Sequence, residues 1–218
     1  RGVRLLSQEI QLGGADRRRV CVMLRWPELA SSRWRDRIER AGAAIEEAGF
    51  SLGVNVGARA SEAQIDTFLR QVAVGHPDLF QLPERAGSPA LWRARLREHI
   101  DGAPLIGRSC HDLAGLQTAF AQEVDCGWLS PIYATASKPT TKGLGTAALQ
   151  SACQQVSGAV IALGGIDSVR VSSCLAAGAY GVACIRSAWG QQVGELVQAC
   201  FASDDGAGGS EPGWSDVP

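Results

Sequence analysis

The chain has 218 residues, a formal net charge of -1 and 20% charged residues. These values are ordinary for a globular protein and provide no basic field that would attract nucleic acid or an anionic lipid surface. No apolar run reaches the ~18 to 20 residues that a membrane span needs. The N-terminal stretch RGVRLLSQEIQLGGADRRRV lacks the apolar core of a secretory signal. We therefore expect a cytoplasmic protein without nucleic-acid or membrane partners.

The 7 cysteines are scattered along the chain without a C-x-x-C pair. This spacing indicates neither a zinc site nor a disulfide framework. Most lie among apolar or small residues, where a thiol behaves as a small buried hydrophobe. Cys110 stands beside a candidate site residue, and strand alternation allows its side chain to point away into packing.

From residue 19 onward, segments typical of strands alternate with segments typical of helices. The expected strands are short and apolar, at 19–26, 51–56, 78–82, 104–109, 126–132, 159–165 and 180–187. The expected helices have apolar residues at helical spacing, at 30–50, 61–73, 90–100, 112–124, 145–156, 167–178 and 189–202. Strict repetition with short connections predicts parallel strands joined by right-handed crossovers.

The number of repeats favours a closed α/β barrel over an open sheet. Seven strand–helix units are visible, and RGVRLLS at the N-terminus supplies an eighth strand. Only about ten residues separate this strand from the next, too few for an ordinary crossover helix. We therefore predict a single (β/α)8 TIM barrel over residues 1–202 whose first unit is abbreviated or irregular. The Gly-, Ser- and Asp-rich residues 203–218 are expected to be a disordered tail.

The lysines are concentrated in one place. Lys and Arg together number 21, yet the chain has only two lysines, Lys138 and Lys142, both in the segment SKPTTKG. The surrounding loop 135–143 adds the hydroxyls of Thr135 and Ser137 and lies where a barrel strand ends. Ammonium groups and hydroxyls in this arrangement suit an anion, whereas a polar surface loop is the structural alternative.

Two further strand ends carry features of a phosphate site. Gly164 and Gly165 follow a continuous apolar strand, and Arg186 and Ser187 follow the next. In many barrels the loops after the last two strands donate backbone N–H groups to phosphate, and glycine permits the close approach. Arg186 adds a guanidinium that can bind phosphate with two hydrogen bonds. A tight turn that requires positive φ is the structural reading of the glycine pair.

A third strand end carries Ser109, Cys110 and His111. An imidazole at this position can take up and return a proton during a reaction. The alternative is a histidine that caps the helix beginning at Asp112.

Three ordered stretches resemble one known family, the thiamine phosphate synthase/TenI superfamily. They are GRSCHDLAGLQTAFAQEVDCGWLSPIYATASKP, then TKGLG, then IALGGIDSVRVSSCLAAGAYGVACIRSAWG. The likeness is strong over 104–190 and weak over 19–103, and is closest to the variant fused to Nudix hydrolases. It implies a (β/α)8 barrel with phosphorylated pyrimidine and thiazole ligands at the C-terminal ends of the strands.

The resemblance also assigns roles to individual residues. Thr135, Ser137 and Lys138 match the synthases' pyrophosphate-holding motif, and the S-x-H of Ser109 and His111 matches the TenI branch, where the histidine is catalytic. Arg25 is the one residue kept from an early-strand Q-x-R-x-K motif, and Asn55 from an Asn-Asp pair.

The departures from the family concern magnesium. Val56 stands where the magnesium-binding Asp is expected, and DLFQLPER lacks the His, the glycines and the Asp of a further motif, with Glu84 as an uncertain substitute. Magnesium takes one or two carboxylates together with substrate phosphates. The sequence thus predicts no metal site and no convincing cofactor, although a diphosphate substrate would call for magnesium.

Two functions follow from these residues. The first is an enzyme acting on a phosphorylated thiazole- or pyrimidine-type heterocycle, by C–N bond formation with pyrophosphate release or by thiazole isomerisation, with His111 and Arg25 as catalytic residues. The alternative is an inactive barrel that binds a phosphorylated ligand or serves as the partner domain of a Nudix hydrolase. A homo-oligomer is compatible with either.

Overall fold

The computed structural model describes residues 17–26, 34–56, 62–135, 142–185 and 192–202. The predicted N-terminal strand and the tail 203–218 therefore lie outside the described residues. The chain divides into two compact units. The first runs to Arg108 and includes Gln122–Val124, and the second comprises Ser109–Ala121 and the chain from Asp125 onward.

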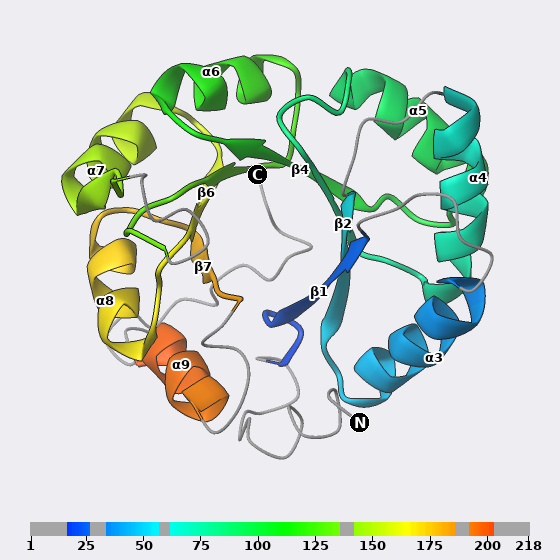
Figure 1. Ribbon diagram of the computed structural model, residues 1–218, viewed down its shortest axis with the longest axis horizontal. Helices are drawn as coiled ribbons and strands as arrows, with labels where there is room; N and C mark the ends of the chain where they lie inside the picture. The colour runs from blue at the N-terminus through cyan, green and yellow to red at the C-terminus, as the bar shows by residue number, and fades with distance from the viewer. Residues whose placement is uncertain (1–16, 27–33, 57–61, 136–141, 186–191, 203–218) are drawn as a thin grey trace. The chain divides into compact units, whose positions relative to one another are not determined.

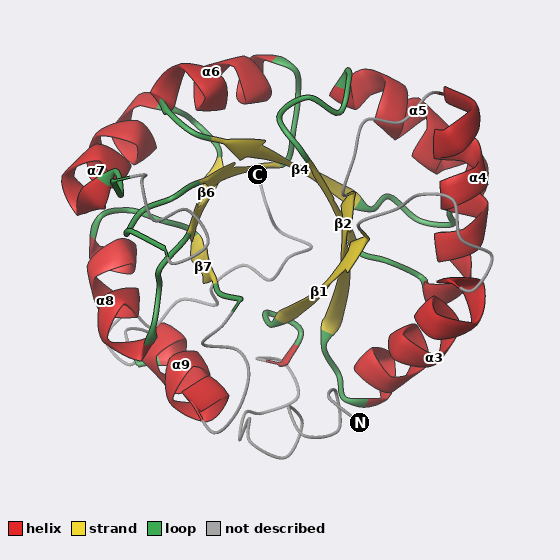
Figure 2. Cartoon of the chain, in the orientation of Figure 1, coloured by secondary structure: helices red, strands yellow, loops and turns green. Residues whose placement is uncertain are grey.

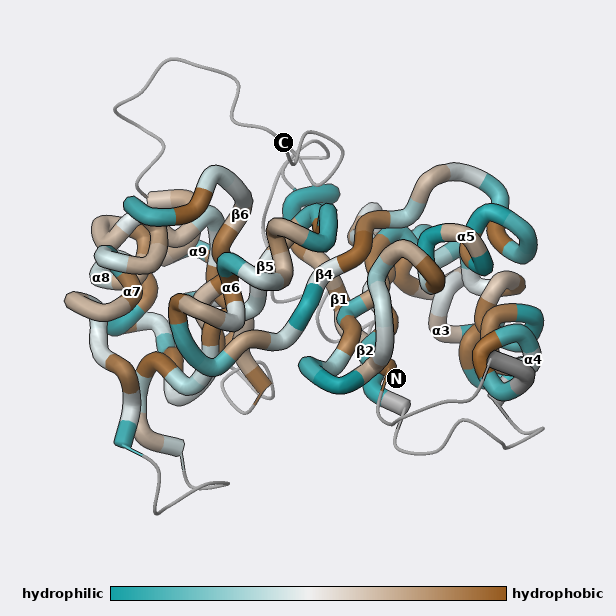
Figure 3. The backbone as a smooth tube through the Cα atoms, turned by 90° about the horizontal axis from the view of Figure 1, so that it is seen from above, coloured by the Kyte–Doolittle hydropathy of each residue, from teal (hydrophilic) through white to brown (hydrophobic). Residues whose placement is uncertain are grey.

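The first unit contains parallel strands in chain order, with a helix after each of the first three (Figure 1). Its elements are β1 (Cys21–Trp26), α3 (Trp34–Glu47), β2 (Ser51–Val56), α4 (Glu62–Val72), the short 3-10 helix η1 (Ala73–Gly75), β3 (Leu79–Leu82), α5 (Pro89–His99) and most of β4 (Leu105–Cys110). Hydropathy changes from turn to turn along its helices (Figure 3), as expected for helices with one buried face.

Asp78 joins the beginnings of three strands in this unit. Its backbone N–H donates to the carbonyl of Leu52 at 2.8 Å, and its carboxylate accepts from the Leu52 N–H at 2.8 Å. Its own carbonyl accepts from the N–H of Leu105 at 2.8 Å. These contacts fix the register of β2, β3 and β4 at the ends opposite the candidate site residues.

The second unit repeats the arrangement with β5, β6 and β7 parallel and in chain order. Its elements are the end of β4, α6 (Leu113–Ala121), β5 (Cys126–Leu129), α7 (Gly145–Gln155), β6 (Ala159–Leu163), α8 (Ser168–Ala176), β7 (Gly181–Ala183) and α9 (Gln192–Phe201). The helices α7 and α8 lie on one side of β6 and β7 (Figure 2). All four residues of β5 are buried, the pattern of a parallel strand covered on both faces.

The described residues thus form a parallel α/β fold with seven strands, each paired only with parallel neighbours where pairing is described. Each of the seven strands predicted from residue 19 onward is found, with ends shifted by a few residues. None of the described helices combines the length and the apolar composition that a membrane span requires.

Candidate functional site

His111 lies at the end of β4, where the second unit begins. Its Nδ1 lies 2.7 Å from the carbonyl oxygen of Ser130, and the Ser130 N–H donates to the carbonyl of Cys110 at 3.0 Å. A carbonyl only accepts hydrogen bonds, so Nδ1 carries the hydrogen and the neutral ring keeps its lone pair on Nε2. The side chain is exposed, and His111 therefore presents an oriented proton acceptor.

The cap of helix α6 is Asp112 rather than His111. The Asp112 carboxylate accepts from the Gly115 N–H at 2.7 Å, which is the usual N-cap hydrogen bond. Cys110 is buried, and a Cβ placed on Gly115 would lie 3.6 Å from the Cys110 Cβ. The Cys110 side chain thus faces helix α6 as a packing residue, and alternation places Ser109 on the opposite face of β4.

Three loops of the second unit are joined through their backbones. Ile132 and Tyr133, which follow β5, donate their N–H groups to the carbonyls of Leu163 and Gly164 at 2.9 and 3.0 Å. Leu144 donates to the Pro131 carbonyl at 2.9 Å. The segments after β5 and β6 and the segment before α7 are therefore hydrogen-bonded to one another, and His111 is attached to them through Ser130.

The turn Gly164–Gly165 cannot accommodate side chains. Both residues have positive φ, 105° and 65°, and Cβ atoms would lie 2.9 Å from Pro131 and 2.8 Å from the carbonyl oxygen of Ala134. Because Tyr133 holds the Gly164 carbonyl, the N–H of Gly165 points to the opposite side of that trans peptide. No residue among those described accepts a hydrogen bond from it. Helix α8 begins just beyond, with Asp167 as its N-cap, so the turn places this N–H beside a helix N-terminus, an arrangement suited to an anion.

The remaining anion-binding predictions divide into two groups. Thr135 directly follows Ala134 at the glycine turn, and Lys142 is exposed beside Gly143, where a Cβ would lie 2.6 Å from the Tyr133 Cα. Ser137, Lys138, Arg186 and Ser187 lie outside the described residues. Within the second unit the structure therefore brings together Thr135, Gly164 and Gly165, with His111 and Lys142 on the connected loops.

Two predicted residues, Arg25 and Asn55, belong to the first unit. They are register partners on β1 and β2, and Asn55 pairs in turn with Gln81 of β3. The Asn55 Nδ2 donates to Gln81 Oε1 at 2.5 Å. Gln81, with 5% of its surface exposed, was not predicted as a site residue. The signal in the sequence was an amide within the otherwise apolar strand LFQL.

The magnesium site that the family implies would lie at strand ends of the first unit, of which only the end of β3 is followed by described residues. Val56 is completely buried at the end of β2. Glu84 is the one carboxylate among the described residues that directly follow β3, and the residues that directly follow β1 and β2, at 27–33 and 57–61, lie outside the described ranges. The Glu84 carbonyl accepts a hydrogen bond from Arg108, and no second carboxylate from the described part of these strand ends joins it. We therefore derive no reaction step through a metal.

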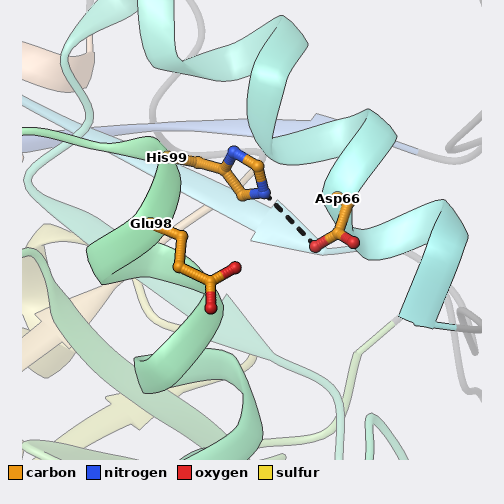
Figure 4. Close-up of side chains that lie close together, drawn as sticks. All are labelled: Asp66, Glu98 and His99. Carbon is orange, nitrogen blue, oxygen red and sulfur yellow. Dashed lines mark hydrogen bonds and ion pairs between the residues drawn. The ribbon is translucent and has the colours of Figure 1, made fainter.

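Asp66, Glu98 and His99 lie close together on helices α4 and α5 (Figure 4). His99 Nε2 is 3.3 Å from Asp66 Oδ1, and the Arg95 guanidinium lies 3.6 Å from that carboxylate and 3.1 Å from Glu98. Arg95 already supplies the positive charge that a metal ion would bring. The cluster is an ion-pair network that joins two helices, each partly exposed pair contributing about 0–1 kcal/mol.

Trp128 on β5 has a buried indole N–H without a hydrogen-bond partner among the described residues. Burial raises the pKa of the neighbouring Cys126 thiol to about 12, and the indole offsets part of that rise. The thiol is therefore neutral, and its sulfur is a weak acceptor. By contrast, the buried Trp92 donates its indole N–H to the Ala86 carbonyl at 2.9 Å.

These two tryptophans give a matched pair of substitutions. Trp128→Phe and Trp92→Phe remove the same atoms, but the Trp128 N–H has at most the weak Cys126 sulfur as acceptor, whereas Trp92→Phe breaks a buried hydrogen bond to a carbonyl and leaves that carbonyl unpaired. We expect the free energy of unfolding to fall by about 1–2 kcal/mol more for Trp92→Phe than for Trp128→Phe. Urea denaturation, followed by circular dichroism, measures the free energy of unfolding of each variant. Equal losses would show that the Trp128 N–H has an acceptor after all.

The parallel strands, each followed by a helix where the chain is described, make this an α/β protein with a glycine turn and an oriented histidine at its strand ends. A family model described as Thiamine monophosphate synthase (TMP-TENI) matches residues 16–188. The chain belongs to this family.

Individual relatives match the chain over part of its length. A thiamine-phosphate synthase of Methanoculleus marisnigri is 41% identical over 88 residues, 40% of this chain and 42% of the relative. A thiamine-phosphate synthase of Mycobacterium sp. (strain KMS) is 35% identical over 92 residues, 42% of this chain and 41% of the relative. These matches span about half the length of the curated relatives.

The fold extends further than these matches. The structure of a thiamine phosphate pyrophosphorylase from Pyrococcus furiosus aligns with a TM-score of 0.63 and 16% identity over 89% of this chain and 90% of that one. At this identity the likeness concerns the fold alone.

Proposed function

We propose that this chain is a thiamine phosphate synthase/TenI-like enzyme acting on a phosphorylated thiazole- or pyrimidine-type heterocycle. The observation that carries the proposal is the link between His111 and the Gly164–Gly165 turn. Both are bound to the segment Ser130–Thr135, His111 through the Ser130 carbonyl and the turn through Tyr133. The segment Ser130–Thr135 thus holds both a proton-transfer group, His111, and the Gly164–Gly165 turn, which we propose as the phosphate cradle.

In the proposed site the phosphate accepts hydrogen bonds from the Gly165 N–H and the first turn of α8, with Thr135, Ser137, Lys138 and Lys142 around it. The backbone donors are set in place before the ligand arrives, which limits the entropy lost on binding. The Nε2 atom of His111 accepts a proton from the heterocyclic ring of the ligand and then returns it to another atom of that ring. The Ser130 carbonyl, which accepts the Nδ1 hydrogen, stabilises the imidazolium formed in between.

Of the two reactions, isomerisation is the better supported by the described residues. It requires proton transfer alone, which His111 supplies. C–N bond formation is favoured by the names of the relatives, but Val56 stands where the resemblance places a magnesium-binding Asp, and magnesium would neutralise the charge of the pyrophosphate leaving group. The inactive binding barrel is the less favoured reading because His111 is oriented and exposed.

The fold that we propose is a single (β/α)8 barrel over residues 1–202, in keeping with the aligned length of the Pyrococcus furiosus structure. We propose Arg25 and Asn55, with Gln81 beside them, as ligand-binding residues of the first unit, and Arg186 and Ser187 as phosphate-binding residues of the second. The ligand is a phosphorylated small molecule and the setting cytoplasmic.

Calorimetric titration tests the proposal. We expect thiamine phosphate and the phosphorylated thiazole to bind, and the unphosphorylated thiamine and thiazole to bind at least about tenfold more weakly. Lys142→Ala is expected to weaken binding of the phosphorylated ligands about tenfold, since a charged hydrogen bond is worth about 1.5–3 kcal/mol.

Each titration is run with and without magnesium. A strong dependence on magnesium would favour C–N bond formation over isomerisation. Equal affinity for phosphorylated and unphosphorylated ligands, or no binding of either, would contradict the proposed phosphate site.

A further inference from the structure

Arg170 contacts both loops that form the proposed phosphate cradle. Its NH1 group donates to the Gly165 carbonyl at 2.5 Å, and its guanidinium carbon lies 4.6 Å from the centre of the Tyr133 ring. We propose that Arg170 is a positioning residue that clamps the glycine turn against the loop after β5 and so fixes the direction of the phosphate-binding N–H. This inference rests on the proposed function of that turn.

The position of Arg170 in helix α8 is electrostatically unfavourable. It is the third residue of the helix, after the N-cap Asp167, which accepts a hydrogen bond from the Arg170 N–H. Helices favour acidic residues in this turn, because the positive end of the dipole repels a cation by about 0.3–1 kcal/mol. A residue that breaks a local rule is expected at a functional position. The Asp167 carboxylate, 3.6 Å from NH1, offsets part of the cost.

Tyr133 and Arg170 contact each other, and each also donates a hydrogen bond to one carbonyl of the glycine turn. The Tyr133 N–H holds the Gly164 carbonyl at 3.0 Å, and Arg170, which lies over the Tyr133 ring, holds the carbonyl of Gly165. Both carbonyls of the glycine pair are therefore fixed by groups that are themselves in contact. Glycine otherwise rotates its peptides easily. Fixing the two carbonyls fixes the Gly165 N–H between them, because that N–H lies opposite the Gly164 carbonyl across a trans peptide.

Arg170 can act through its planar fork or through its charge alone, and two variants separate these effects. Arg170→Lys keeps the charge, but an ammonium group cannot stack a plane on Tyr133 while donating to Gly165. Arg170→Met keeps the stem and removes both the plane and the charge. If the clamp is the cause, Arg170→Lys resembles Arg170→Met, and if the charge is the cause, Arg170→Lys resembles the wild type.

The first measurement is the affinity for inorganic phosphate and thiamine phosphate by calorimetry. We expect the dissociation constants to rise about tenfold in Arg170→Met and nearly as much in Arg170→Lys. Arg93→Met is the matched control, because Arg93 also donates to a backbone carbonyl, that of Glu123 at 2.9 Å, but belongs to the first unit. It should leave the affinity unchanged. Wild-type affinity in Arg170→Met or in Arg170→Lys would overturn the clamp.

The second measurement needs no ligand. Hydrogen exchange of the Tyr133 amide, which donates to the Gly164 carbonyl across the clamped loops, followed by NMR, is expected to be about tenfold faster in Arg170→Met than in the wild type at equal thermal stability. An affinity loss without faster exchange would mean that Arg170 contacts the ligand directly, and would overturn the positioning role. If the wild type binds no phosphate, the proposed function fails, and the exchange rates still decide whether Arg170 holds the turn.

Discussion

Replacing His111 with Asn is expected to lower the turnover rate by about 10²–10⁴-fold while ligand affinity changes only a few-fold. Asn keeps an N–H donor near the position of Nδ1, so the hydrogen bond to the Ser130 carbonyl, 2.7 Å long in the native protein, can persist. It removes the Nε2 lone pair that we propose takes up the proton. Steady-state kinetics on the phosphorylated thiazole, with calorimetry on the same samples, separates the rate from the affinity.

His76→Asn is the control for this substitution. His76 is exposed and adopts a left-handed conformation with φ of 50° at the end of η1, which Asn tolerates well. It should leave both rate and affinity at wild-type values. Unchanged turnover in His111→Asn would exclude His111 as the proton-transfer group. If the wild type binds a phosphorylated ligand but turns over none, the inactive binding barrel becomes the better description.

Gly164→Ala is expected to weaken phosphate binding more than about tenfold and to lower the free energy of unfolding by about 2–4 kcal/mol. Two effects combine at this residue. Its φ of 105° is strained for any side chain, and a Cβ would lie 2.9 Å from the backbone Cα of Pro131. The loop after β5 must therefore move away from the turn, which separates Tyr133 from the Gly164 carbonyl.

Gly102→Ala isolates the first effect, the backbone strain. Gly102 has a similar φ of 91°, but a Cβ there would meet no atom within 4 Å. It should cost only the backbone strain, about 1–3 kcal/mol, and leave phosphate binding intact. Chemical denaturation and calorimetry of the two variants give the comparison. Equal stability losses and equal affinities would show that the close approach of the two loops does not hold the cradle together.

The strand–helix alternation could be predicted from the sequence because apolar periodicity is local. The helix predicted at 145–156 is α7, Gly145–Gln155, and the strand predicted at 51–56 is β2, Ser51–Val56. The predicted ends of strands were less accurate where glycines follow the strand. The strand predicted at 159–165 stops at Leu163, because Gly164 and Gly165 turn with positive φ. The strand predicted at 180–187 is described only at Gly181–Ala183.

For the candidate site, the sequence by itself indicated which residue types stand at the strand ends. His111, Thr135, Lys142 and the glycine pair could be named because a strand end is recognised from neighbouring residues. The resemblance of motifs over 104–190 added the phosphate expectation, which stays a prediction, and the family match confirms the resemblance itself.

Only the tertiary structure decided how these residues are oriented. Which nitrogen of His111 carries the hydrogen depends on Ser130, and the burial of Gln81 against Asn55 depends on the register of β2 and β3. The clamp by Arg170 depends on Tyr133, which comes from another loop. Each of these contacts joins segments remote in the chain. Their physical basis is the packing of parallel strands, which brings successive strand ends side by side and which no local pattern records.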